Sequence, residues 1–361
     1  MTTLDADTAT RNKPRRRWYQ FSLRTLLVGM VVIGFGTAWL GVQVKRALDH
    51  RRAVTELAAV AVVYVAKPRN WAQRNEWLRS WLGDDAILDV DEVVFTQVQG
   101  EELELALTHL RGLTQLQKLN FSNTQVSDAG LSHLRGMTQL RTLNLRNTQV
   151  SDAGLSHLEG LTQLQSLNLI NTQVSGAGLS HLRGMTQLEW LDLRDTQVSD
   201  AGLSHLGGLT QLKELDLSST QVSDAGLAHL GGLTRLRTLN LRNTQVSDAG
   251  LSHLGGMTQL QSLHLINTQV SGAGLSHLRG LTELEVLTLD DTQVSDAGLA
   301  HLGGLTRLKW LDLSNTQVND VGLSHLRGLT RLEWLGVSHT QVSDAGIAQL
   351  RESMPKLNVA R

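Results

Sequence analysis

LQKLNFSNTQVSDAGLSHLRGMTQ, residues 116–139, is one unit of a repeat that fills most of this 361-residue chain. The tripeptide Thr-Gln-Val recurs every 24 residues from Thr124 to Thr340, which gives ten units over residues 116–351. A sequence period of this length indicates a solenoid of stacked supersecondary units. Because one unit alone cannot bury its apolar residues, the units must stack to form a continuous core.

Each unit predicts a short strand followed by a short helix. Leu119 and Phe121 alternate with polar residues, which is typical of a strand with one face turned inward. Ser127 is a favourable helix N-cap, Leu131 is expected to point inward, and Gly136 is expected to end the helix. Repetition of this strand–helix unit predicts an α/β solenoid with a parallel sheet.

The pattern L-x-x-L-x-L-x-x-T-x-V resembles the leucine-rich repeat, with Thr at the position that usually holds Asn or Cys. The half-unit VSDAGLSHL, residues 126–134, is similar to the cysteine-containing type of repeat found in F-box proteins, with Thr in place of Cys. The resemblance covers about two thirds of the chain. It implies a leucine-rich repeat arc with strands on the concave side and helices on the convex side, and it implies no reaction. No F-box precedes the repeats, so a ubiquitin-ligase adaptor is not expected.

Charge divides the chain into two regions. Residues 1–52 hold ten Lys or Arg and three Asp, a charge of +7, whereas residues 53–361 hold 23 basic and 31 acidic residues, a charge of −8. A surface that binds nucleic acid needs clustered Lys and Arg. The acidic bulk therefore argues against nucleic acid as a partner.

Residues 25–44, TLLVGMVVIGFGTAWLGVQV, contain no charged side chain. A helix that spans the bilayer needs about 20 mainly apolar residues, and Arg24 and Lys45 close this segment sharply. The segment is long for a signal peptide, and no clear cleavage site follows it, so we expect an uncleaved transmembrane helix. A cleaved signal peptide or a core helix is the alternative. The opening FSLRTLL, residues 21–27, also resembles membrane-anchored bacterial leucine-rich repeat proteins.

Flanking charge predicts the orientation of this helix. Six Lys or Arg precede it and four follow it, which favours a cytoplasmic N-terminus. We therefore expect a single-pass protein of the cell membrane, with residues 1–24 as a basic cytoplasmic tail and with extracytoplasmic repeats.

Residues 45–115 do not follow the repeat and predict a juxtamembrane helix and an N-terminal cap. Residues 59–66 and 88–95 have the composition of strands, and residues 70–82 form an amphipathic helical pattern with three Trp. This order predicts a βαβ cap over the first repeat. At the other end, residues 352–361 predict a C-terminal cap whose last strand includes Leu357.

Two polar columns recur with the repeat. The Asp column, which begins at Asp128, suits helix N-termini, and Gly176 and Gly272 interrupt it. The His column is the one candidate for metal binding, because stacked repeats place equivalent side chains roughly 5 Å apart. It comprises His109, His133, His157, His181, His205, His229, His253, His277, His301 and His325.

No combination of side chains in the sequence predicts an enzyme or a cofactor. The chain has no Cys, which excludes thiol nucleophiles, disulfides and zinc–thiolate sites. Ser, His and Asp are plentiful only as copies of one pattern, whereas catalysis needs unlike groups that converge at one place.

The outward strand positions provide the predicted binding site. Exposed Trp is costly to leave in water, and Trp and Arg are the preferred anchors of binding interfaces. The predicted anchors are Trp190, Trp310 and Trp334, with charge complementarity from Arg146, Arg194, Arg242, Asp290 and Asp312. Cross-strand packing that only shields the sheet is the alternative.

A duplication of four units singles out the same positions. Residues 140–235 and 236–331 differ at 16 of 96 positions. The differences include Trp190 against Val286, Arg194 against Asp290, and Glu214 against Trp310. Such changes suit a surface adapted to partners, or a recent copy that drifts where no core restrains it.

These features predict a membrane-anchored module that binds a protein or a cell-envelope polymer through its concave face. Two alternatives remain: a structural envelope protein that self-associates, and a metal-binding protein that uses the His column. The sequence leaves the oligomeric state open.

Overall fold

The structure, a computed structural model, describes residues 23–59, 61–68, 88–95 and 100–361. The chain divides into two compact units, residues 1–48 and 49–361. Helix α1 (Leu23–Leu57) includes the predicted transmembrane segment 25–44, most of whose side chains lie outside the described residues. Among the residues that are described, no helix is long and apolar enough to cross a membrane. The transmembrane helix therefore stays a prediction.

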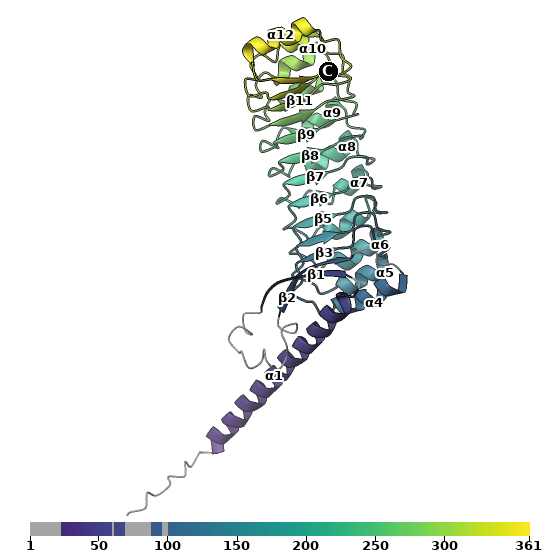
Figure 1. Cartoon of the computed structure of the whole chain (residues 1–361), viewed down its shortest axis with the longest axis vertical. Coiled ribbons are helices and arrows are strands. Elements are labelled where there is room, and N and C mark those ends of the chain that lie inside the picture. Colours follow the sequence, from purple (N-terminus) through teal and green to yellow (C-terminus); the bar gives the residue numbers. More distant parts are fainter. Residues whose placement is uncertain (1–22, 60, 69–87, 96–99) are drawn as a thin grey trace, which may run out of the picture. The chain divides into compact units, whose positions relative to one another are not determined.

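Thirteen described strands form one sheet, in which they follow one another in chain order (Figure 1). They are β1 (Ala61–Pro68), β2 (Leu88–Phe95), β3 (Lys118–Asn120), β4 (Thr142–Asn144), β5 (Ser166–Asn168), β6 (Trp190–Asp192), β7 (Glu214–Asp216), β8 (Thr238–Asn240), β9 (Ser262–His264), β10 (Val286–Thr288), β11 (Trp310–Asp312), β12 (Trp334–Gly336) and β13 (Asn358–Ala360).

Short helices follow the strands. The α-helices are α4 (Gly100–Leu110), α5 (Asp128–Leu131), α6 (Asp152–Leu155), α7 (Asp200–Leu203), α8 (Asp224–Leu227), α9 (Asp248–Leu251), α10 (Asp296–Leu299), α11 (Asp320–Ser324) and α12 (Asp344–Ser353). The 3₁₀ turns are η2 (Ser132–Leu134), η3 (Ser156–Leu158), η4 (Gly178–Leu182), η5 (Ala228–Leu230), η6 (Ser252–Leu254), η7 (Gly274–Leu278) and η8 (Ala300–Leu302).

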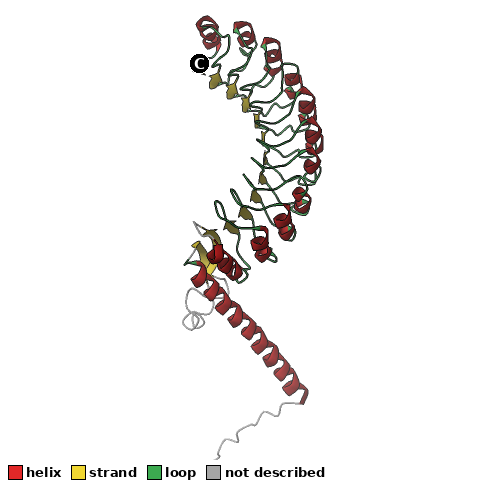
Figure 2. Cartoon of the chain, turned by 90° about the vertical axis from the view of Figure 1, so that its right-hand side faces the viewer, coloured by secondary structure: helices red, strands yellow, loops and turns green. Residues whose placement is uncertain are grey.

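The repeats of residues 49–361 form a curved solenoid, with the strands along its inner side and the helices along its outer side (Figure 2). From β3 to β12 each strand pairs in parallel with the next at an offset of 24 residues, as in the pair Leu119↔Leu143. The predicted parallel sheet and leucine-rich repeat architecture are therefore confirmed.

One apolar core runs through the stacked units from Ala53 to Leu357. In the first unit Leu119, Phe121 and Leu131 are buried, as the alternation and the helical spacing predict. The helix predicted to run to Gly136 is shorter than expected, because α5 ends at Leu131 and a 3₁₀ turn continues the chain. Gly136 follows with φ +88°, the left-handed conformation in which a glycine ends a helix at little cost.

The Asp column joins neighbouring units. The carboxylate of Asp128 accepts hydrogen bonds from the backbone N–H (2.7 Å) and from Oγ (2.6 Å) of Ser151, which is the helix N-cap of the next unit. The same pair of bonds recurs at Asp152, Asp200, Asp224, Asp248 and Asp320. A unit that carries this Asp therefore holds the N-cap residue of the following unit, a role that the helix N-terminus alone does not predict.

Two junctions lack this carboxylate because Gly176 and Gly272 replace Asp. There the backbones come together instead. A Cβ on Gly176 would lie 3.1 Å from the Cα of Gly202, and one on Gly272 would lie 3.0 Å from the Cα of Gly298. The close approach of one unit to the next therefore favours glycine at these positions.

The turn after each strand also depends on a conformational choice. The residue before each repeating Thr has a positive φ, from Asn123 (60°) to His339 (56°), and this residue is most often Asn or Asp. These residue types tolerate the left-handed region better than most others. The buried hydroxyl of Thr124 donates to the carbonyl of Phe121 (2.7 Å), so the repeating Thr bonds the backbone of its own turn.

The N-terminal cap differs from the predicted βαβ unit. β1 and β2 pair antiparallel, whereas the two strands of a βαβ unit run parallel. The helix predicted at residues 70–82 lies outside the described residues. A parallel strand–helix–strand unit does occur one element later, where β2 continues through α4 to β3. Alternation alone does not encode strand direction, which explains the error.

The C-terminal segment ends in a strand as predicted, but this strand runs from Asn358 to Ala360 and does not include Leu357. Helix α12 ends at Ser353 before Pro355, and β13 extends the sheet in parallel with β12. Leu357 and Met354 are buried beneath this end of the core.

We expect a pH-dependent contribution to stability from Asp320. Hydrogen bonds from the hydroxyl and backbone N–H of Ser343 lower the pKa of Asp320 below its ordinary value of 3.8. The ionised carboxylate therefore stabilises the fold at neutral pH, and this contribution is lost as the pH falls through the lowered pKa. At pH 7 the thermal unfolding midpoint of Asp320→Asn should be lower than that of the wild type. The difference between the two midpoints should shrink toward pH 2.

Asp291→Asn is the matched control, because Asn occupies the same turn position at Asn267 and Asn315. A wild-type advantage over Asp320→Asn that stayed constant down to pH 2 would contradict the role of ionisation.

Candidate functional site

Every predicted anchor on the concave face lies on a strand or directly after one. Trp190, Trp310 and Trp334 are the first residues of β6, β11 and β12. In register, Trp310 pairs with Trp334, so the two are neighbours across adjacent strands, as predicted. Trp190 lies on β6, five strands away from Trp310 on β11, so it does not join this pair. It is half-buried between Ser166 and Glu214 on the neighbouring strands.

Trp310 and Trp334 form a stacked aromatic pair. Their ring centroids are 3.9 Å apart and the ring planes differ by 13°. Trp310 remains 42% exposed, although burial of such a ring is strongly favourable. The pair therefore presents a fixed apolar surface on the inner side of the solenoid.

Gly336 gives this pair its position. A Cβ at Gly336 would clash with Oδ1 of Asp312 and would lie 2.6 Å from Cη2 of Trp334. The indole of Trp334 and the carboxylate of Asp312 therefore share the space that a side chain at 336 would fill. Oδ1 of Asp312 is held in turn by the backbone N–H (3.0 Å) and Oγ (2.7 Å) of Ser314.

Arg194 is not a free cation on this face. Its guanidinium donates to both oxygens of Asp192, at 2.7 Å in the shortest contact, and its Nε lies 3.3 Å from Oδ2 of Asp216. The hydrogen bond with Asp192 raises the pKa of the Arg194 guanidinium. Asp192 is only 1% exposed, so this ion pair belongs to the internal structure of the sheet. The prediction that Arg194 provides charge for a partner is therefore weakened.

The remaining predicted charges are more available. Arg146 and Arg242 are exposed at equivalent positions of the two four-unit copies, and neither forms an ion pair with a described residue. Asp290 is half-buried and accepts a hydrogen bond from Nδ2 of Asn315 at 3.1 Å. The concave face thus carries one exposed, unpaired arginine in each copy, and the second copy adds the carboxylate of Asp290.

His264 belongs to the same face. It lies at the end of β9, and its Nδ1 is 3.2 Å from Oγ1 of Thr288. Burial lowers the pKa of His264, although the negative charge of Asp216 acts in the opposite direction. His264 was not predicted as a site residue. The available signal was that His264 replaces Asn168 of the first copy.

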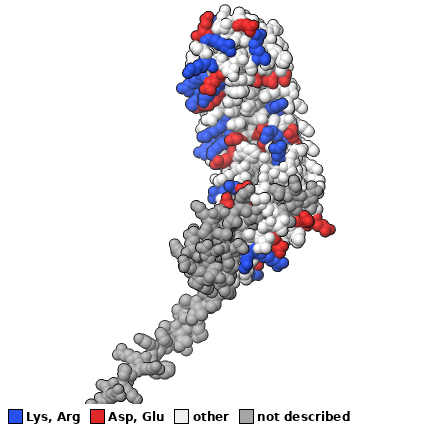
Figure 3. Space-filling model, viewed as in Figure 1, with Lys and Arg blue, Asp and Glu red and all other residues white. Residues whose placement is uncertain are grey.

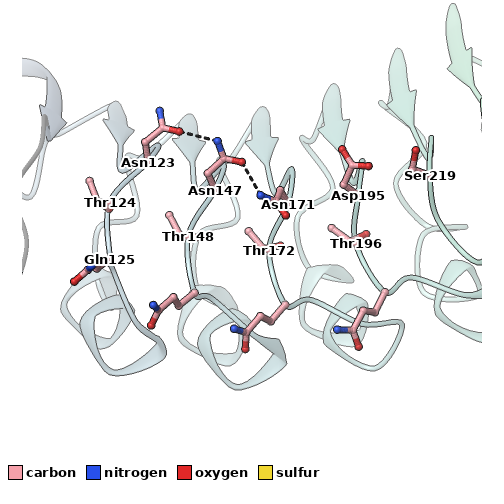
Figure 4. A pocket seen from close by; sticks show the side chains of 13 residues that line it. Asn123, Thr124, Gln125, Asn147, Thr148, Asn171, Thr172, Asp195, Thr196 and Ser219 are labelled. Atoms are coloured by element: carbon pink, nitrogen blue, oxygen red, sulfur yellow. Dashed lines mark hydrogen bonds between the residues drawn. The ribbon is translucent and has the colours of Figure 1, made fainter.

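A polar groove of about 790 Å³ runs along the turns that follow the first strands (Figure 4). Side chains of the Asn-Thr-Gln turns line it, from Asn123 to Ser219. Nδ2 of Asn147 donates to Asn123 (2.7 Å) and Nδ2 of Asn171 donates to Asn147 (3.0 Å), so the amides form a ladder across units. Sequence reasoning missed this groove, although the Asn before each Thr was the available signal.

Some members of the His column pair with the preceding unit, mostly with an arginine and in one case, His181, with Glu159. Arg135 donates to Nδ1 of His157 (2.8 Å), and Arg183 donates to Nδ1 of His205 (2.6 Å). Burial and the charge of Arg183 lower the pKa of His205. A guanidinium beside the imidazole opposes the approach of a metal cation. In the described part of the chain, no three His, Asp or Glu side chains are grouped to hold a metal ion.

Charged side chains lie in mixed clusters on the face drawn in Figure 3, where basic and acidic groups are side by side. Ion pairs between neighbouring units account for part of this pattern, such as Lys213–Glu189 (2.6 Å) and Lys309–Glu285 (2.7 Å). The hydrogen bond from Lys309 lowers the pKa of Glu285. These exposed pairs contribute little to stability individually.

Comparison with protein families identifies the repeats. A family described as leucine-rich repeat region matches residues 101–283, and a second family, leucine rich repeat, matches residues 282–342. Among curated proteins, none matches this sequence.

Solved structures agree on the fold. An internalin (inlF) from Listeria monocytogenes is 24% identical with a TM-score of 0.59, and the match covers 81% of this chain and 97% of the internalin. A TDR receptor is 18% identical with a TM-score of 0.55, and the match covers 71% of this chain and 44% of the receptor. At these identities the likeness supports the curved repeat architecture alone.

Proposed function

Because the chain belongs to the leucine-rich repeat proteins, we propose that it is a membrane-anchored binding module whose concave face recognises a protein or a cell-envelope polymer. The stacked pair Trp310–Trp334 is the observation that carries the proposal. A large aromatic surface left exposed on a rigid sheet is characteristic of a binding surface. One of the solved structures with a similar fold is a TDR receptor, which is consistent with a role in recognition.

Membrane anchoring is the second part of the proposal and rests on the sequence. Residues 25–44 carry no charge over a length that matches the bilayer, and the flanking Lys and Arg favour a cytoplasmic N-terminus. The repeats then lie outside the cytoplasmic membrane, where a concave face of ten units is available to the partner.

Alanine at both Trp310 and Trp334 should abolish capture of this partner. The stack supplies the largest exposed apolar surface among the described strands, and loss of such an anchor typically weakens binding by about 2 kcal/mol or more, which is over tenfold in affinity. The test compares proteins and glycans captured from cell-envelope extract by full-length wild type and by the double variant, after both are shown to fold.

Val321→Ala is the matched control, because Val321 is 64% exposed on α11, away from the strands. Equal capture by the double variant and the wild type would place the binding site elsewhere. Capture of nothing by either chain, together with concentration-dependent assembly, would favour the self-associating envelope protein instead.

A further inference from the structure

The two four-unit copies of the chain differ in the hydrogen bonds and ion pairs that one carboxylate on the concave face receives. In the first copy, Oδ1 of Asp216 accepts from the backbone N–H (2.9 Å) and Oγ (2.6 Å) of Ser218. Its Oδ2 receives Nε of Arg194 at 3.3 Å and Nδ2 of Asn240 at 2.9 Å. Both oxygens of this carboxylate are therefore satisfied from within the protein.

In the second copy, Asp312 occupies the equivalent position, 96 residues later. Its Oδ1 keeps both bonds, from the N–H and Oγ of Ser314. Its Oδ2 has neither donor, because Asp290 replaces Arg194 and Gly336 replaces Asn240. The cation of the first copy is thus replaced by a second carboxylate, and no described residue forms an ion pair with Asp290 or Asp312.

The aromatic pair appears at the same place. Trp310 replaces Glu214 of the first copy, Trp334 stands 96 residues after Thr238, and the edge of Trp334 and the Asp312 carboxylate both lie over Gly336. The substitutions that remove the internal cation therefore also bring two stacked indoles next to the carboxylate. An indole beside a carboxylate attracts a planar cation through both cation–π and charge-assisted hydrogen bonding.

We propose that Asp312, Asp290 and the Trp310–Trp334 stack bind an arginine side chain of a partner protein. This inference rests on the proposed function and names the partner chemistry at its main anchor. The guanidinium is planar and stacks on aromatic rings, and it donates to a carboxylate from two nitrogens, whereas the lysine ammonium acts as a point charge. The incoming arginine takes the position that Arg194 fills in the first copy.

The test uses the full-length chain in detergent micelles and the peptide acetyl-Ala-Arg-Ala-amide as probe. Binding is followed through the indole N–H signals of Trp310 and Trp334 in NMR spectra, assigned by single Trp→Phe variants. The peptide should shift these two signals and leave that of Trp190 unchanged. The same peptide with citrulline, which keeps the shape but not the charge, should bind at least about tenfold more weakly.

Asp290→Arg is the decisive variant, because it replaces a carboxylate of the proposed site with a cation next to Asp312, although Thr288 stands where the first copy has Asp192. It should raise the Kd of the arginine peptide by about tenfold or more while leaving the thermal unfolding midpoint at least as high as in the wild type. Glu214→Gln removes an exposed concave carboxylate of the first copy and should leave the Kd within about twofold of the wild-type value. If Asp290→Arg is less stable than the wild type, Asp312→Asn serves as the second variant and should weaken binding to a similar degree.

Equal binding of the citrulline peptide, or unchanged binding by the Asp290 and Asp312 variants, would overturn the inference. So would an arginine peptide that shifts neither Trp310 nor Trp334. If partner capture depends on the Trp pair while the arginine peptide fails to bind, the inference is wrong and the proposed function stands. If capture does not depend on the Trp pair, the proposed function itself is wrong.

Discussion

Replacing Phe121 with alanine is expected to lower the free energy of unfolding by about 3–5 kcal/mol. Phe121 is fully buried, and its ring stacks on Phe95 with centroids 4.8 Å apart. Removal of the ring leaves a cavity between β2 and the first full repeat and removes the aromatic contact between them. Urea unfolding followed by circular dichroism measures the change.

The repeat itself provides the control. The equivalent residue in the next units is Leu, at Leu145 and Leu169, so Phe121→Leu restores the common residue at this position. A substitution of one large apolar residue for another usually costs less than about 1.5 kcal/mol. A cost of Phe121→Ala below about 1.5 kcal/mol would show that the cap does not depend on the Phe121 ring.

The second large effect is expected at Gly202. A Cβ on this residue would clash with the Cα of Gly176 and lie 2.9 Å from its carbonyl oxygen. These are backbone atoms, and they cannot rotate away from the new Cβ as a flexible side chain can. Gly202→Ala must therefore separate the two units, and overpacking of this kind typically costs about 1–3 kcal/mol.

Gly208→Ala is the matched control, because no atom lies within 4 Å of a Cβ at that position. Thermal unfolding should show a marked loss of stability for Gly202→Ala and a change of no more than a few tenths of a kcal/mol for Gly208→Ala. Because each unit contacts only its neighbours, the Gly202 variant should also broaden the transition or split it at this junction. Equal midpoints for the two variants would mean that the close approach is not required.

The fold was largely predictable from the period of the sequence. Ten copies of one 24-residue pattern identify the strand, the inward Leu residues and the stacking direction, because only one face of each unit is apolar. The period does not reveal which atoms meet across a junction. The bonds from Ser151 to Asp128 therefore became visible only in the structure. Likewise, alternation predicted β1 and β2 but not their antiparallel pairing.

The candidate site was predicted in part. The 24-residue spacing of Trp310 and Trp334 predicts neighbours on adjacent strands, and the structure confirms this. The pairing of Arg194 with Asp192 was missed, although their spacing of two residues on a strand places both side chains on one face. The prediction assigned each exposed charged residue to a partner contact and did not consider ion pairs with the charged residues beside it.

The central claim is that the concave face binds the partner, and site-specific crosslinking tests it most directly. A photoreactive benzoylphenylalanine replaces Val286, which pairs in register with Trp310, or Val321, which is exposed on α11. After irradiation in cell-envelope extract, we expect a crosslinked partner from position 286 and none from position 321. A partner crosslinked from position 321 but not from position 286 would show that the concave face is not the binding surface.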